Sequence, residues 1–383
     1  MNNKKLILIS LYHPNTAISN RFLAFVKAYG ELGVDVKVYF VELNKNYDRI
    51  KDEYANVEFI YPIPKLKTKN KYLRFLITIL SMLYLFFKIE KNSNVIFYTG
   101  FDFIWLFNLR RNLKIYHERT EHPDVVGKSN GIFDELRHKK YLKSLKKIDG
   151  LFVISPSLKE YFVEEIKLEE KKVHIINMIV DSSRFNWLES IDKENTISYC
   201  GTISIKKDGI LDLINSFSIV ARKDSDITLT LIGDFQNLDT KNIVHKLIDD
   251  LSIRDRIIFK GNIDSSLMPY MLSKSKILAL ARPYSKQAKY GFATKLGEYL
   301  LSDVPSVITN VGDFKYYLKD MHDIIFAEPD NQNDFANKLL WVLDNYEESK
   351  LIAKNGIDTA NKSFNYMIEA KKVINVIFKN ENV

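Results

Sequence analysis

The stretch Tyr290–Asp313, YGFATKLGEYLLSDVPSVITNVGD, decides the fold of the chain. Apolar residues at helical spacing predict a short helix over Lys295–Leu301, which a glycine-containing loop precedes. A turn with Pro305 follows, and the apolar run Val307–Val311 then predicts a buried strand. A helix that returns through a tight turn into a buried strand is typical of an α/β sheet.

The first turn of this helix has the residue types of an anion site. Thr294 is expected to cap the helix, because a threonine oxygen at this position accepts an amide of the first turn. Free amides and the helix dipole favour a phosphate there, and Lys295 adds a full charge. Glu298 lies three residues after Lys295, so it shares the helix face and is placed to accept sugar hydroxyls. The alternative is an ordinary amphipathic helix without a ligand.

A second glycine loop, GTISIKKDG at residues 201–209, follows the predicted strand Thr196–Cys200 and precedes the predicted helix Ile210–Ala221. A glycine at a strand end, followed by lysines before a helix, is again a pattern that binds anions. Lys206 and Lys207 are compact charges that suit a diphosphate. The alternative is a solvated turn.

The sequence GFATKLGEYL, followed by a turn with proline and by VITNVGD, resembles the donor-binding segment of GT-B glycosyltransferases. The group that it resembles is the retaining family 4, in the form that works on bacterial surface polysaccharides. The loop at 201–209 resembles the G-x-x-x-x-K-G loop of that family. Two positions depart from the family pattern: Tyr290 stands where a glutamate is usual, and Thr202 stands where an arginine is frequent.

The resemblance implies an α/β protein with two Rossmann-like domains facing a cleft, the GT-B fold. We expect an N-terminal acceptor-side domain over residues 1–188, a nucleotide-sugar-binding domain over 189–363, and a last helix, 364–383, that crosses back to the first domain. The residues implied to bind the donor nucleotide sugar are Gly201, Thr202, Lys206, Lys207, Gly261, Thr294, Lys295, Leu296 and Glu298.

Strands alternating with a helix predict a doubly wound sheet in the first half as well. Lys4–Ser10 and Val34–Val41 are predicted strands, and Arg21–Leu32 is a predicted helix between them. Asn20 and Arg21, at the start of this helix, are candidate acceptor-side residues that approach a phosphate. A structural surface role is the alternative.

A polar cluster follows the predicted strand Leu113–His117. His117, Glu118 and Glu121 leave the carboxyl end of this strand, where ligands bind in open α/β sheets. The cluster resembles the acceptor-side segment of family 4 enzymes, which implies that His117 orients the sugar or the acceptor. A structural hydrogen-bonding role for this histidine is the alternative. The histidine spacing of zinc sites is absent from the sequence, so no metal site is expected.

One strongly apolar helix is predicted over residues 73–89, after the basic segment KLKTKNK at 65–71. Its uninterrupted apolar part, Phe75–Phe87, is shorter than the ~20 residues that a spanning helix needs. Three interpretations stay open: a helix buried against the sheet, an interfacial membrane helix, and a span. The basic flank is typical of a contact with an anionic membrane surface.

Length and composition fit two globular domains, since the chain has 383 residues of which 46% are hydrophobic. The single cysteine, Cys200, excludes an internal disulfide and favours the cytoplasm, and no signal peptide is predicted. The net charge of +8 favours anionic partners. Nucleic acid is not expected among them, because aromatic and basic residues are not interleaved on a recognisable module.

Together these inferences predict a hexosyltransferase in the cytoplasm or at the inner face of the cytoplasmic membrane. It would move a sugar from a nucleoside diphosphate sugar, with UDP favoured, to a hydroxyl of a glycan or lipid-linked glycan. Lys207 and Lys295 would neutralise the leaving diphosphate, and His117 completes the predicted catalytic set. No cofactor besides the donor substrate is expected. The alternatives are a sugar-nucleotide epimerase or hydrolase on the same fold and a non-catalytic scaffold at a membrane surface.

Overall fold

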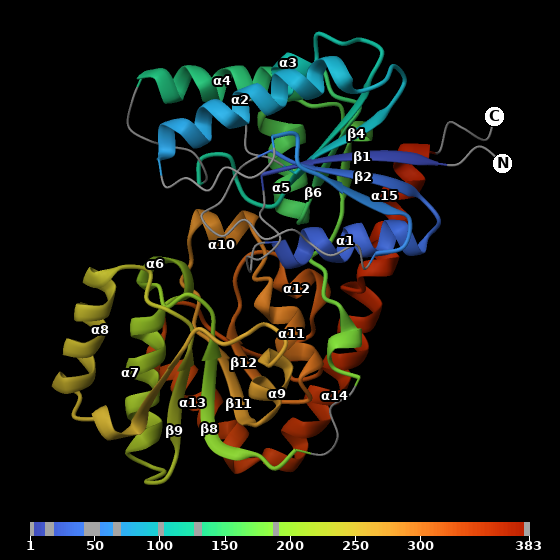
Figure 1. Ribbon diagram of the computed structural model, residues 1–383. Coiled ribbons are helices and arrows are strands. Elements are labelled where there is room, and N and C mark those ends of the chain that lie inside the picture. The colour runs from blue at the N-terminus through green and yellow to red at the C-terminus, as the bar shows by residue number, and fades with distance from the viewer. Residues whose placement is uncertain are drawn as a thin grey trace. The chain divides into compact units, whose positions relative to one another are not determined.

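The computed structural model describes residues 4–11, 19–41, 54–63, 70–98, 103–125, 132–186 and 191–378. It divides into two units, the first formed by Met1–Ile179 with Tyr366–Val383 and the second by Val180–Asn365. Each unit has one β-sheet accompanied by helices (Figure 1), and every described strand pair is parallel. The predicted α/β class with two parallel sheets is therefore confirmed.

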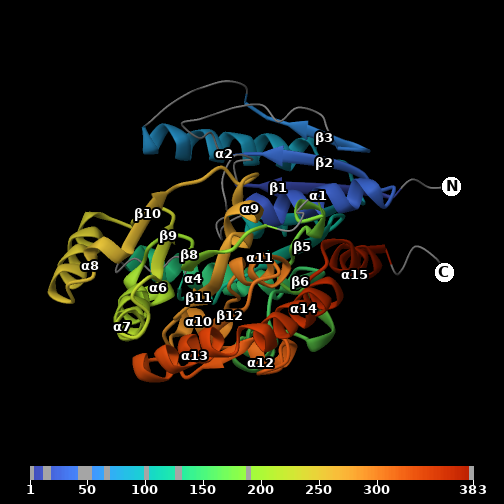
Figure 2. The same cartoon turned by 90° about the horizontal axis from the view of Figure 1, so that it is seen from below.

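The first unit is built on a seven-stranded sheet in the order β3-β2-β1-β4-β5-β6-β7, and Figure 2 shows β3, β2 and β1 as successive strands. The interior strand β1 reads KLILIS, a nearly continuous apolar run that suits a strand covered on both faces. The strands are β1 (Lys5–Ser10), β2 (Asp35–Phe40), β3 (Val57–Ile60), β4 (Asn94–Tyr98), β5 (Lys114–Arg119), β6 (Gly150–Val153) and β7 (Val173–Ile175).

The helix α15 (Tyr366–Phe378) belongs to the first unit, although residues 180–365 of the second unit precede it in the chain. It packs against α1 (Ser19–Glu31), and Ala370 and Ile374 share one buried apolar core with Phe25. This core therefore combines two segments that are far apart in the sequence. The other helical segments of this unit are α2 (Lys71–Lys88), α3 (Ile104–Phe107), α4 (Ile132–Leu145), α5 (Pro156–Glu160), a π-helical turn (Tyr161–Glu165) and a 3-10 turn (Glu170–Lys172).

The second unit is built on a six-stranded sheet in the order β10-β9-β8-β11-β12-β13. Its strands are β8 (Glu194–Cys200), β9 (Thr228–Ile232), β10 (Ile257–Gly261), β11 (Ser275–Leu280), β12 (Ser306–Thr309) and β13 (Ile325–Ala327). Its helices are α6 (Ile205–Asp208), α7 (Ile210–Ala221), α8 (Leu238–Asp250), α9 (Met268–Ser273), α10 (Lys286–Tyr290), α11 (Lys295–Leu301), α12 (Phe314–Tyr317), α13 (Gln332–Asp344) and α14 (Tyr346–Ser363), with 3-10 turns at Ser182–Arg184 and Arg254–Arg256.

The apolar helix predicted over residues 73–89 is α2. Asn70 caps its first turn, because the side-chain oxygen accepts the N–H groups of Tyr72 and Leu73. Within the described ranges, no helix combines the length and the apolar character that a membrane crossing requires. The basic residues 65–69 before α2 lie outside the described residues.

The shared core of α1 and α15 predicts a large effect of truncation in α15. Replacing the buried Ile374 by Ala should destabilise the first unit by about 2–5 kcal/mol, because the lost methyl groups leave a cavity. The exposed neighbour Asn375 is the matched control, and Asn375→Ala should have little effect. Urea unfolding of the full chain measures both, and equal stabilities of the two variants would contradict the packing described here.

Candidate active site

The carboxyl end of β8 meets the first residue of α11 at Gly201. The φ angle of Gly201 is +139°, a conformation that residues with a side chain rarely adopt. A Cβ atom there would lie 2.3 Å from the Nζ atom of Lys295. The backbone angle therefore favours a glycine at this position, and any side chain there would displace the end of Lys295.

The loop predicted over residues 201–209 contains the short helix α6. Ser204 caps this helix, because its side-chain oxygen accepts the N–H of Lys207 at 3.3 Å. Gly209 then leads the chain into α7 with a φ angle of +64°, and a Cβ atom there would lie 1.9 Å from the carbonyl oxygen of Ala281. The end of the loop is thus packed against the residue that follows β11.

The predicted diphosphate lysines lie on this short helix. The side chains of Lys206 and Lys207 are exposed, as is Thr202 nearer the strand. The carbonyl of Lys207 accepts a hydrogen bond from Nε of Arg282 at 3.3 Å. The helix therefore offers two accessible cations while its backbone is fixed by a third, buried one.

Lys295 belongs to a largely buried polar cluster. Its Nζ atom donates to Oδ2 of Asp208 at 2.8 Å and to the hydroxyl of Tyr199 at 3.0 Å. The Tyr199 hydroxyl also lies 2.8 Å from the same carboxylate oxygen. On the other side, Nε of Arg282 lies 3.9 Å from Oδ1 of Asp208, and these two side chains are each 3% exposed. Two cations therefore share one buried carboxylate.

The charges of this cluster stabilise one another. Burial lowers the pKa of Lys295, and the Asp208 carboxylate acts against this shift. Burial also opposes ionisation of Asp208, but Lys295 and Arg282 outweigh it and hold the pKa of Asp208 below its usual value. With all three groups ionised, the two cations and one carboxylate leave one net positive charge. Such an excess attracts an anion.

Glu298, the predicted partner of sugar hydroxyls, has an ion pair that the sequence did not indicate. Its Oε1 atom accepts a hydrogen bond from Arg184, and Arg184 also donates to the carbonyl of Ser265 at 2.6 Å. Arg184 ends the 3-10 turn that follows Asp181, whose side chain accepts the N–H of Ser183. The segment NMIVDSSRF contains this arginine, but no spacing links it to a glutamate more than a hundred residues later.

Thr294 does not cap α11, which corrects the expectation from the sequence. Its backbone is already helical, with φ −59° and ψ −30°, and its side chain makes no capping hydrogen bond. A capping residue needs an extended backbone, so the hydroxyl is misplaced for this role. The N–H of Leu296 donates to the carbonyl of Ala293 at 3.0 Å, so this amide is used within the turn.

Three glycines join the carboxyl ends of neighbouring strands. The N–H of Gly201 donates to the carbonyl of Ile232, and the N–H of Gly233 donates to Gly261, each at 2.8 Å. Gly261 itself has a φ angle of +63°. These bonds place the predicted donor residue Gly261 at the same sheet edge as Gly201.

In the first unit, Arg21 and Glu118 pair with each other. The distance between Nη2 and Oε1 is 2.9 Å, and both side chains are largely buried. Arg21 also donates from Nη1 to the carbonyl of Asn177 at 2.7 Å. Asn20, the residue before Arg21, is exposed. The structure thus brings two predicted acceptor-side residues together, as a bond between α1 and β5.

His117 is fully buried in β5. Its Nδ1 atom lies 2.9 Å from the carbonyl oxygen of Phe97, and its Nε2 atom lies 3.1 Å from the hydroxyl of Tyr141. Burial, with a smaller contribution from Arg119, lowers the pKa of His117 to about 3, so the ring is neutral at pH 7. Both ring nitrogens are occupied in this conformation, and the role in orienting a sugar stays a prediction. The nearby Glu121 is half-buried and its carbonyl accepts Nε–H of Arg119.

Residues 183–359 match the family model described as glycosyl transferases group 1. The matched range lies within the second unit, and it supports glycosyl transfer as the chemistry of the chain. No curated protein sequence is significantly similar to this chain.

Solved structures with the two-domain GT-B fold resemble the whole chain. A glycosyltransferase from Rickettsia africae is 17% identical with a TM-score of 0.75, covering 100% of both chains. Sucrose-phosphate synthase from Thermosynechococcus elongatus is 16% identical with a TM-score of 0.77, covering 98% of this chain and 99% of that one. Anabaena Alr3699/HepE, solved with UDP and glucose, is 12% identical with a TM-score of 0.74 and full coverage of both chains, 100% each. At these identities the likeness shows the fold.

The buried cluster predicts a pH-dependent loss of stability in Asp208→Asn. At pH 7 the variant should be about 3–5 kcal/mol less stable, because Lys295 and Arg282 lose their carboxylate. The pKa of Asp208 is lower when folded, so its stabilising charge is present above the usual value of 3.8 and is lost as the pH falls below it. The difference from the unaltered chain should therefore shrink in acid. Unfolding curves at several pH values test this, with the exposed Asp239→Asn as the control.

Proposed function

We propose that the protein is a retaining glycosyltransferase of the family 4 type. It moves a hexose from a nucleoside diphosphate sugar to a hydroxyl of an acceptor. The observation that carries the proposal is the junction of α6 and α11, where Lys295 lies against Gly201 and pairs with Asp208 at 2.8 Å. A diphosphate at this junction would meet a cationic cluster from two loops that are far apart in the sequence.

In this reaction the site has to stabilise the leaving diphosphate. When the sugar departs, negative charge develops on the diphosphate, and fixed cations stabilise that charge most strongly where little water is present. Lys295 is 15% exposed at its side chain, so it is partly shielded but reachable. Lys206 and Lys207 add accessible charges on α6. In this proposal these cations act in place of a metal ion, and no cofactor besides the donor is used.

UDP is the nucleotide that we propose for the donor. Anabaena Alr3699/HepE, which resembles this chain in fold, was solved with UDP and glucose. Glu298 is the proposed partner of the ribose hydroxyls: one of its oxygens binds Arg184, and the carboxylate has acceptor capacity for further bonds. Attack on the face from which the diphosphate leaves is the proposed retaining course, because Lys207 and Lys295 serve the leaving group and no nucleophile is assigned.

The proposed acceptor is a glycan or lipid-linked glycan of a bacterial surface polysaccharide, and the proposed location is the inner face of the cytoplasmic membrane. Acceptor-side groups are assigned to the first unit at the start of α1 and the end of β5. Asn20 is exposed there, and Glu121 is half-buried. Nucleic acid is not part of the proposal.

Isothermal titration of UDP and GDP, followed by a panel of their sugars, tests the donor site. UDP should bind, and Glu298→Ala should weaken it about 10- to 100-fold, because hydrogen bonds to a charged group contribute about 1.5–3 kcal/mol. Lys295→Met should weaken UDP and leave uridine unaffected, since uridine has no phosphate. Glu348→Ala, at an exposed glutamate of α14, is the control.

Turnover assays separate the alternatives. Efficient release of UDP only with a glycan acceptor supports the transferase. Consumption of the donor sugar without any acceptor would instead indicate an epimerase or hydrolase. A chain that binds no nucleotide and no nucleotide sugar would be a scaffold, and the proposal would be wrong.

A further inference from the structure

The helix α2 of the first unit is apolar on opposite faces. Its inner face is buried, with Ile77, Met82 and Leu85 at most 4% exposed. Its outer face carries a second row of apolar residues, which are spaced four, four, three and four positions apart. This spacing places them along one side of a helix. The side chains of this row are 41 to 80% exposed: Tyr72, Leu76, Leu80, Leu83 and Phe87.

This outer row is a large surface. The helix has 18 residues and is therefore about 27 Å long. A helix that is apolar all round is normally covered on all sides, by protein or by lipid. Exposed apolar patches of this extent mark interaction sites on soluble proteins. Among the described residues, the outer row of α2 stays exposed to solvent, so this row is open to another occupant.

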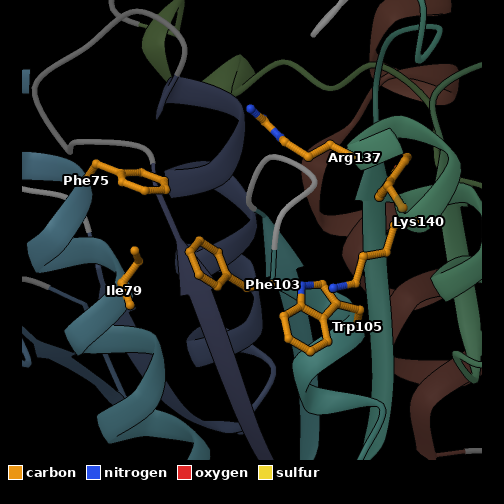
Figure 3. Close-up of a pocket in the computed structure, with 7 residues that line it drawn as sticks. Phe75, Ile79, Phe103, Trp105, Arg137 and Lys140 are labelled. Atoms are coloured by element: carbon orange, nitrogen blue, oxygen red, sulfur yellow. The ribbon is translucent and has the colours of Figure 1, made fainter. Parts of the chain in front are cut away.

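A groove continues the apolar surface from α2 to α4. It has a volume of about 210 Å³ and its walls come from α2, α4 and the segment around α3. Figure 3 shows Phe75 and Ile79 of α2 opposite Phe103 and Trp105. Lys140 of α4 lies over Trp105, with its Nζ atom 3.4 Å from the ring centroid. The groove therefore has mainly apolar walls and two cations, Arg137 and Lys140, in its lining.

The charges around this surface are mainly positive. Helix α2 contains no acidic residue, and its last turn carries the exposed Lys88. On α4, Arg137, Lys140 and Lys143 follow one another at intervals of three residues, and all are exposed. Asp134 pairs with Arg137 at 3.2 Å, which leaves the two lysines as excess charge along this row. An apolar strip beside a row of cations is complementary to lipid chains beneath anionic headgroups.

A protein partner fits this surface less well. The centres of protein interfaces are depleted of charged residues, and lysine is under-represented in them. Here a lysine, Lys140, lines the groove itself. In a bilayer surface this arrangement is favourable, because apolar side chains enter the acyl boundary while long cationic side chains reach the phosphates.

We propose that α2 and the groove beside α4 form a docking face that lies in the surface of an anionic lipid bilayer. The outer row of α2 enters the boundary of the acyl chains, Lys140 and Lys143 contact headgroups, and Trp105 lies at headgroup depth. The face belongs to the first unit, so the proposal does not rest on the donor chemistry of the second unit and can fail independently of it.

Co-sedimentation of the full chain with vesicles tests this docking face. The chain should bind vesicles of phosphatidylglycerol and phosphatidylcholine, bind pure phosphatidylcholine much less, and lose affinity in high salt. Lys140→Glu with Lys143→Glu should lower the partition coefficient about tenfold or more, since each cation contributes near the surface. Leu76→Ser with Leu80→Ser should also lower it at least tenfold.

Two matched pairs on α8 of the second unit control for charge and apolarity. Lys241→Glu with Lys246→Glu reverses two exposed lysines, and Leu238→Ser with Ile243→Ser removes two exposed apolar side chains. Both pairs should leave vesicle binding unchanged, and circular dichroism verifies that every variant is folded. No binding to anionic vesicles, or equal losses in the α2–α4 and α8 variants, would overturn the proposal.

Fluorescence locates the contact. The chain has three tryptophans, and Trp187→Phe with Trp341→Phe leaves Trp105 alone. Vesicles with brominated lipid should quench Trp105 strongly on binding. Binding without quenching would overturn the proposed face, as would a vesicle-independent dimer that dissociates in the Leu76→Ser and Leu80→Ser variant, because the occupant would then be a second copy of the chain.

Discussion

The ion pair of Lys295 and Asp208 is the constraint on which the second unit's site depends. It fastens the start of α11 to the end of α6 at 2.8 Å, and Gly201 leaves the space through which the lysine passes. A buried pair of this kind adds little net stability, but removal of one partner is costly. It therefore fixes geometry more than it strengthens the fold. Because Arg282 shares the same carboxylate, the junction keeps a positive excess.

The elements of this site could be predicted from local patterns, whereas its pairings could not. Helical spacing predicted α11 with the same bounds that the structure shows, and the apolar runs predicted β8 and β12. Asp208 stood in the sequence as one more charge in a polar loop, and Arg184 lay 114 residues before its partner Glu298. No periodicity links such positions, since only the fold of the chain makes them neighbours. Thr294 does not cap α11 for a local reason, because its own backbone is already helical.

The first unit shows how similar residue types can serve the interior. From the sequence, Arg21 and Glu118 were expected to contact a ligand. In the structure they form an ion pair with each other. His117 is neutral and bonded at both nitrogens, so it connects β4 to α4 through Phe97 and Tyr141. Position at a strand end indicates where polar residues gather, but not whether they face a ligand or one another. The excess of apolar side chains on α2 was readable from the sequence, and its two-sided distribution required the structure.

The position of α15 has a consequence for biosynthesis. A ribosome delivers residues 180–365 before it delivers 366–378, yet the core around Phe25 needs Ile374 from that last helix. During translation the second unit can therefore complete its core first. The first unit, although synthesised earlier, lacks α15 until then, and the surface of α1 that α15 covers stays open. The order of maturation is then reversed relative to the order of synthesis, and the nascent first half is the portion that chaperones would meet unfinished.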